Sequence, residues 1–192
     1  DSTGSTSADS LDTSDHTNST TPSASTVADS GSRVTASDLF SNRDLNNEYE
    51  EKGSIAIKLN KTSASCSSKA VKISGRTITI TDEGTYILSG TLKNGMVIID
   101  AEKTDKIQLV LNGAKISSST YAAVYVKQAD KVFLTTAANT KNKLSNGGTY
   151  EAIDDNHIDA VIYSKDDLTL NGKGLLKINA KSGHGIVSKD SL

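Results

Sequence analysis

Large aromatic side chains are scarce in this sequence. Of its 192 residues, 4% are aromatic, none is Trp, and 35% are hydrophobic. A compact globular core needs more large side chains than this, whereas a narrow core filled with Val, Ile, Leu and Ala needs fewer. The composition therefore favours a repetitive structure with a slender core.

Cysteine and proline occur once each. Cys66 has no disulfide partner and no nearby histidine to activate its thiol, so we expect no functional role for it. The only proline, Pro22, lies near the N-terminus, and none interrupts residues 53–192. No apolar run approaches the ~20 residues that a membrane-spanning helix requires.

Neither sign of charge dominates, since the sequence contains 21 basic and 23 acidic residues and the net charge is -2. This balance argues against binding a polyanion by bulk electrostatics, so nucleic acid is not an expected partner. The sequence also lacks a nucleophile elbow, a phosphate-binding loop, a dinucleotide fingerprint and the Cys/His spacing of a zinc site. No catalytic residue can be assigned from a local motif.

What the sequence does contain is a repeated β pattern. The stretch VIYSKDDLTLNG at residues 161–172 is echoed upstream by residues 124–134 and downstream by residues 186–192. Ser164 and Ser188 lie 24 positions apart, close to one coil of a solenoid. Short β runs separated by Gly, Asn and Asp predict an all-β fold, a parallel β-helix. A β-sandwich is the alternative, although it does not predict the repeat.

Composition divides the chain in two. In residues 1–37, 19 residues are Ser or Thr, which predicts a disordered linker. Residues 38–192 form the predicted folded domain, opening with a short helix capped by Ser37 or Ser41 that covers the open end of the solenoid. Because Leu192 falls inside a repeat, we expect further coils beyond it.

An acidic loop interrupts the repeat. The interval from Tyr125 to Tyr163 is 38 positions, so about 14 residues must leave the coil as a loop, and long loops on solenoids often carry function. Clustered carboxylates without cysteine suit calcium. A solvated loop with Asp at turn positions is the alternative. The acidic residues in and after this loop are Glu151, Asp154, Asp155, Asp159, Asp166 and Asp167.

Aligning the repeats creates two columns of side chains. Lys127, Lys165 and Lys189 form one, and Tyr125, Tyr163 and Val187 form the other. Strand alternation places both columns on the outside, with coils ~4.8 Å apart, roughly the length of one sugar residue. Exposed rings can stack on sugars and ammonium groups can pair with uronate carboxylates. Alternatively, the lysines pair with neighbouring aspartates and only keep the surface soluble.

Several segments together carry a family resemblance. They are FSNRDL at 40–45, GTYILSGTL at 84–92, VLNGA at 110–114, AVYVK at 123–127, AVIYSKDDL at 160–168 and HGIVSKD at 184–190. This set resembles a family of exported bacterial carbohydrate-binding proteins. The resemblance implies a right-handed parallel β-helix similar to the pectate lyase fold, bound calcium, and affinity for acidic plant polysaccharide such as polygalacturonate, or for cellulose.

The same resemblance implies site residues and a location. The implied calcium ligands are Asp154, Asp155, Asp159, Asp166, Asp167 and Asp190, and the expected location is extracellular or attached to the cell surface. Binding without catalysis is the favoured function. A calcium-assisted polysaccharide lyase, with Lys165 or Lys189 as its base, and a structural stalk or adhesin are the alternatives.

Overall fold

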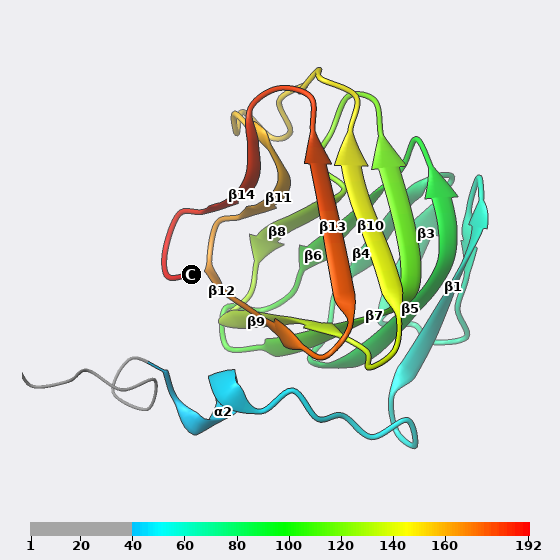
Figure 1. The fold of residues 1–192 in the computed structure, drawn as a ribbon, viewed down its shortest axis with the longest axis vertical. Helices are drawn as coiled ribbons and strands as arrows, with labels where there is room; N and C mark the ends of the chain where they lie inside the picture. Colours follow the sequence, from blue (N-terminus) through cyan, green and yellow to red (C-terminus); the bar gives the residue numbers. More distant parts are fainter. Residues whose placement is uncertain (1–39) are drawn as a thin grey trace, which may run out of the picture. The chain divides into compact units, whose positions relative to one another are not determined.

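The computed structural model describes residues 40–192, which form two β-sheets and one short helix (Figure 1). Sheet A contains eight strands: β1 (Ile55–Lys61), β2 (Ala64–Ser65), β5 (Gly84–Lys93), β7 (Lys106–Ser118), β9 (Lys131–Thr136), β10 (Lys141–Asn146), β12 (Asp167–Gly172) and β13 (Leu175–Ala180). Sheet B contains six: β3 (Val71–Ser74), β4 (Thr77–Ile80), β6 (Met96–Asp100), β8 (Val124–Gln128), β11 (Ala160–Ser164) and β14 (His184–Ser188).

The all-β prediction is confirmed, but the prediction of a right-handed parallel β-helix is wrong, because both sheets are mixed. β1 pairs with β2 antiparallel, and β3 pairs with β4 antiparallel, alongside the parallel pairs of each sheet. Alternation of apolar and polar residues identifies a strand but not the direction of its neighbour. The two-residue connection at Gly75 and Arg76 is short enough for a hairpin, which the repeat pattern did not reveal.

The segments that repeat in the sequence do lie side by side. Tyr163 of β11 is the register partner of Tyr125 in β8 and of Val187 in β14, and both pairs of strands are parallel. The repeat therefore describes one part of sheet B correctly, although it does not extend to the whole fold.

Sheet A has two halves, because β7 changes partners along its length. Residues 106–111 of β7 pair with β9, and residues 115–118 pair with β10. β5 shifts register between Leu88 and Gly90, where Gly90 has a φ of 94° and an added Cβ would collide with the carbonyl oxygen of Leu59. We call β9, β12 and the N-terminal parts of β5 and β7 the first half. β10, β13 and the C-terminal parts of β5 and β7 are the second half, whose strands run side by side in Figure 1.

Two apolar clusters lie on opposite faces of sheet B. The larger one joins both sheets and takes in Leu88 and Leu109 of sheet A with Val124 and Val126 of sheet B. Tyr125, between those two valines, belongs to the smaller cluster instead. Strand alternation explains this separation, since neighbouring residues on a strand point to opposite faces.

The short helix α2 (Asn42–Leu45) is capped by Ser41, one of the two N-cap residues that the sequence predicted; the other, Ser37, lies outside the described residues. The Ser41 side chain accepts a hydrogen bond from the Asp44 N–H, while the Asp44 carboxylate accepts one from the Ser41 N–H, which forms a capping box. The expected position over an open end is wrong, because Asp44 contacts Lys131 of β9 and Thr169 of β12 on the outer face of sheet A. The predicted linker, residues 1–37, lies outside the described residues. Within residues 40–192 no helix is long and apolar enough to cross a membrane.

Candidate functional site

The two predicted binding tyrosines are covered. They face away from the large core, as strand alternation predicts, but Tyr125 is 0% exposed and Tyr163 is 4% exposed. Ile153 and Ile158 of the acidic loop pack with them, and the two rings meet edge to face with centroids 6.1 Å apart. The expectation of exposed sugar-stacking rings is therefore wrong for this conformation. Burying the rings stabilises the fold, and the loop supplies the apolar side chains that do so.

The three predicted lysines lie on neighbouring strand ends of sheet B but differ in their surroundings. The N–H of Lys165 donates to the Val126 carbonyl, and that of Lys189 donates to the Ser164 carbonyl. Lys127 forms ion pairs with Asp100 at 3.1 Å and Asp154 at 2.9 Å. Hydrogen bonds with Asp154 and Asp100 raise the pKa of Lys127 above its ordinary value. Lys165 and Lys189 are exposed, and Lys189 Nζ lies 5.8 Å from the centre of the Tyr163 ring.

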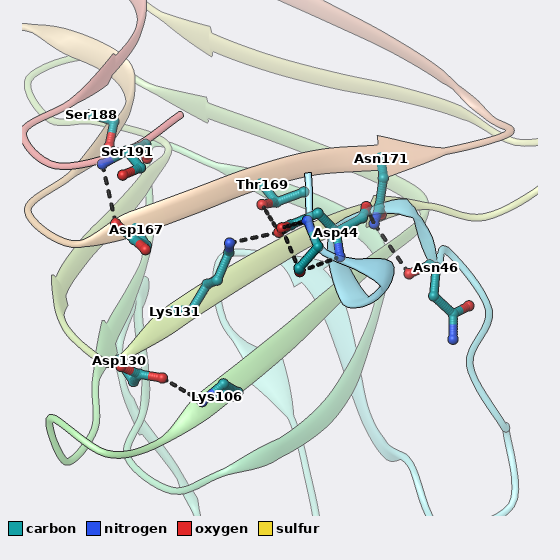
Figure 2. A network of polar contacts seen from close by, with 11 residues as sticks. Asp44, Asn46, Lys106, Asp130, Lys131, Asp167, Thr169, Asn171, Ser188 and Ser191 are labelled. Carbon is teal, nitrogen blue, oxygen red and sulfur yellow. Dashed lines mark hydrogen bonds and ion pairs between the residues drawn. The ribbon is translucent and has the colours of Figure 1, made fainter. Parts of the chain in front are cut away.

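The predicted calcium ligands are dispersed. Asp154 and Asp155 form the exposed tip of the loop, both with positive φ, and Asp159 lies 3.8 Å from His184 Nε2. The carboxylate of Asp166 accepts a hydrogen bond from the Ala129 N–H at 3.0 Å. Asp167 accepts one from the Ser191 N–H at 3.1 Å (Figure 2). Asp190 is exposed.

These aspartates do not fit a single calcium site in this conformation. Among residues 40–192, no three Asp, Glu, His or Cys side chains are grouped closely enough to hold a metal ion. Asp166 and Asp167 instead accept backbone hydrogen bonds from the segments that follow β8 and β14. Calcium therefore stays a prediction from the sequence, and EDTA should lower the melting temperature if the folded chain binds the ion selectively.

The structure brings together a set of lysines that the sequence analysis missed. Lys143 of β10 is the register partner of Lys115 in β7 and of Lys177 in β13, and all three are exposed. They are separated by 28 and 34 positions, outside the 24-residue repeat. A shared local pattern could have revealed them, since each lysine is followed by an aliphatic residue and then by Ser or Asn.

A polar column accompanies this lysine column. Ser145 is the partner of Ser117 and of Asn179, two positions after the respective lysines and on the same face of the sheet. Two shallow depressions, of about 380 and 170 Å³, lie along this face and share Ser117, Lys143 and Ser145. Neither depression is lined by an acidic or aromatic residue. We call this outer surface of the second half of sheet A the lysine face.

The charge of the lysine face is not neutralised. No ion pair of the described chain involves the lysines of this surface, which are Lys93, Lys115, Lys141, Lys143, Lys177 and Lys181. Elsewhere, Lys106, Lys127 and Lys131 each have an aspartate partner. The lysine face is therefore a local cationic surface on a chain that is close to neutral overall.

The first half of sheet A is covered by the segment around α2. Figure 2 shows Asp44 between Lys131, whose Nζ lies 2.6 Å from its carboxylate, and Thr169, whose hydroxyl donates to it at 2.7 Å. Although burial opposes ionisation, the hydrogen bonds from Lys131, Ser41 and Thr169 hold the pKa of Asp44 well below its ordinary value. Asn171 donates to the carbonyls of Asp44 and Asn46, which fixes the segment to β12.

The model of one protein family, described as carbohydrate-binding domain-containing proteins, matches residues 74–192. The chain belongs to this family. The match includes β10, β13 and the second-half parts of β5 and β7, so the lysine face lies within the family domain.

A family relative and a solved structure support this assignment. A carbohydrate-binding domain-containing protein of Acetivibrio thermocellus is 37% identical over 124 residues, which are 64% of this chain and 43% of that protein. The structure of a polysaccharide lyase-like protein from C. thermocellum, a gadolinium derivative, aligns with a TM-score of 0.67 and 33% identity. That alignment covers 70% of this chain and 56% of the solved chain, so this chain spans only part of either protein's length.

Proposed function

We propose that this chain binds an acidic polysaccharide along the lysine face and does not cleave it. The observation that carries the proposal is the exposed column of Lys115, Lys143 and Lys177, which has no ion-pair partner in the described chain. An unneutralised column of like charges is a suitable surface for an anionic polymer. Membership of a carbohydrate-binding family makes a glycan the expected polymer.

The spacing of the column suits a uronate chain that runs across the strands. Paired strands lie ~4.8 Å apart, so successive lysines are separated by roughly the length of one sugar residue. Each ammonium group can then pair with one carboxylate. The neighbouring Ser117, Ser145 and Asn179 side chains can exchange hydrogen bonds with sugar hydroxyls.

The lining of the lysine face favours an acidic glycan over cellulose. Neutral sugars are commonly held by stacking on aromatic rings, and neither depression offers one. Charge pairing remains as the main source of affinity and specificity. Polygalacturonate belongs to the proposed ligand class, and a location outside the cell, where such polymers occur, is part of the proposal.

Retardation in gels that contain polygalacturonate tests this function. We expect the triple variant Lys115→Ala, Lys143→Ala, Lys177→Ala to bind about ten- to a hundredfold more weakly, since each exposed charge contact contributes up to about 1 kcal/mol. The matched control is Lys52→Ala, Lys72→Ala, Lys103→Ala, which removes three exposed lysines elsewhere and the same net charge. Equal retardation of the two variants would contradict the proposal.

Cleavage of the glycan is the second candidate, because the similar solved structure is described as polysaccharide lyase-like. Elimination needs a base, and the two candidate bases, Lys165 and Lys189, lie at strand ends of sheet B and not on the lysine face of sheet A. The binding proposal therefore expects no new ultraviolet absorbance from unsaturated uronate when the chain is incubated with polygalacturonate and calcium. A steady increase in that absorbance would contradict the binding proposal and support the lyase function instead.

A further inference from the structure

We propose that residues 153–156 are a lid over a second sugar-contact site, formed by Tyr125 and Tyr163 on the outer face of sheet B. With the lid raised, an acidic sugar residue would contact the two rings and pair with the lysines at the adjacent strand ends. The inference rests on the proposed function for its ligand class, but the site is separate from the lysine face.

The buried hydroxyl group of Tyr125 lacks a hydrogen-bond partner, and a ligand could supply one. Tyr125 is fully buried, and its Oη is the one buried side-chain oxygen or nitrogen in residues 40–192 that has no hydrogen-bond partner. Leaving a buried polar group unsatisfied costs about 1–3 kcal/mol. By contrast, the buried Tyr86 in the main core donates its hydroxyl to the Asp82 carbonyl at 2.6 Å. A sugar hydroxyl beside the Tyr125 ring would satisfy the group that the closed lid leaves unpaired.

The lid is weakly attached at its tip and firmly attached at its ends. Ile153 and Asn156 exchange two backbone hydrogen bonds across the two-residue turn formed by Asp154 and Asp155. The tip is bound to sheet B by the Lys127–Asp154 ion pair, whose side chains are 35% and 57% exposed, and by the contacts of Ile153. Such a pair contributes less than about 1 kcal/mol.

The ends of the loop carry stronger restraints. The Glu151 N–H donates to the Thr120 carbonyl at 2.8 Å, and the His184 N–H donates to the Asp159 carbonyl at 2.8 Å. The turn between them also contains two non-glycine residues with positive φ, Asp154 at 49° and Asp155 at 59°, which is a conformation with an intrinsic cost. The tip can therefore lift while the ends of the loop stay in place.

Lifting the tip would also remove one of the two carboxylates that pair with Lys127. Lys127 would lose Asp154 and keep Asp100, and Lys165 and Lys189 are already exposed at the next two strand ends. Lys189 Nζ is 5.8 Å from the Tyr163 ring centre, so a carboxylate held by this lysine would place its sugar close to the ring. Rings and ammonium groups together suit one acidic sugar residue.

Nitration of tyrosine by tetranitromethane, located by peptide mass spectrometry, tests the lid in the absence of any glycan. We expect Asp154→Ala to raise nitration of Tyr125 several-fold, because the variant loses the ion pair that holds the tip. Asp155→Ala is the matched control, since it places alanine at a similar positive φ but leaves the ion pair intact. Tyr86 should stay protected in both variants and reports any general unfolding. Equal protection of Tyr125 in both variants would overturn the lid.

Tyr125→Phe tests the sugar contact. Removing the unpaired hydroxyl should raise the melting temperature, while the affinity for oligogalacturonate falls several-fold. A raised melting temperature with unchanged affinity means that Tyr125 only fills space, and it overturns the inference. If the lysine-face triple variant still loses binding in that case, the proposed function stands alone. If the wild-type chain does not bind the glycan, both fail.

Discussion

The outer surfaces of sheet B and of the two halves of sheet A differ in whether another segment covers them. Phe133, on the first half of sheet A, lies under the α2 segment, with Arg43 Cζ 4.4 Å from its ring centre. Tyr125 and Tyr163, on sheet B, lie under the acidic loop. Among residues 40–192 no segment covers the second half of sheet A in this way, and its outward column consists of Lys115, Lys143 and Lys177.

Folding stability and glycan binding thus depend on different outer surfaces of the sheets. Where an outward position carries a large ring, another segment of the chain buries it and the burial stabilises the fold. Where outward positions carry lysine and small polar residues, less apolar surface is available to bury. Leu175, two positions before Lys177 on β13, is a large apolar side chain of this face and stays 59% exposed. The open face is thus the part of the surface that contributes least to stability, which leaves it available for a ligand.

Removing a covered ring should cause the largest loss of folding stability. Phe133→Ala should lower the free energy of unfolding by about 3–4 kcal/mol, because the ring is 1% exposed despite facing outward. Thr91→Ala on the lysine face should change it by less than about 0.5 kcal/mol. Denaturant unfolding measures both. Similar losses in the two variants would remove the distinction between covered and open faces.

Breaking the attachment of the α2 segment should have the next largest effect. Asp44→Asn should destabilise the chain by about 2 kcal/mol at neutral pH, because Lys131 loses its charged partner. The folded-state pKa of Asp44 lies below its unfolded value, so its contribution is present above about pH 4 and is lost as the pH falls further. Unfolding curves of the two chains should converge in acid; a constant difference would exclude ionised Asp44 as the cause.

The smallest effect should come from the lysine face itself. Lys143 has like-charged register partners on both sides, so Lys143→Ser should raise the free energy of unfolding by a few tenths of a kcal/mol at low salt. High salt should abolish the gain, because these charges are exposed and screened. Denaturant unfolding at two salt concentrations measures the change. Loss of stability at low salt would show that Lys143 stabilises the fold.

Local sequence signals predicted part of the site and missed another part. The repeat of sequence segments aligned Tyr125, Tyr163 and Val187 correctly, because strand register follows the apolar pattern when one face is buried. It could not align Lys115 with Lys143 and Lys177, since the intervening turns and loops differ in length. Nor could it show that Asp154 would pair with Lys127 and bring the loop over the rings.

Local sequence patterns predicted the strands and the outward direction of Tyr125 and Lys127, and they narrowed the helix start to Ser37 or Ser41, because side-chain alternation and capping depend on nearby residues. The direction of each strand's neighbour, the cover over the outward rings and the lysine column became known from the folded chain. Those features depend on contacts between residues far apart in the chain, such as Asp44 with Thr169 and Lys115 with Lys143. Chain order does not specify which such contacts bury the most apolar surface, and that burial selects the fold.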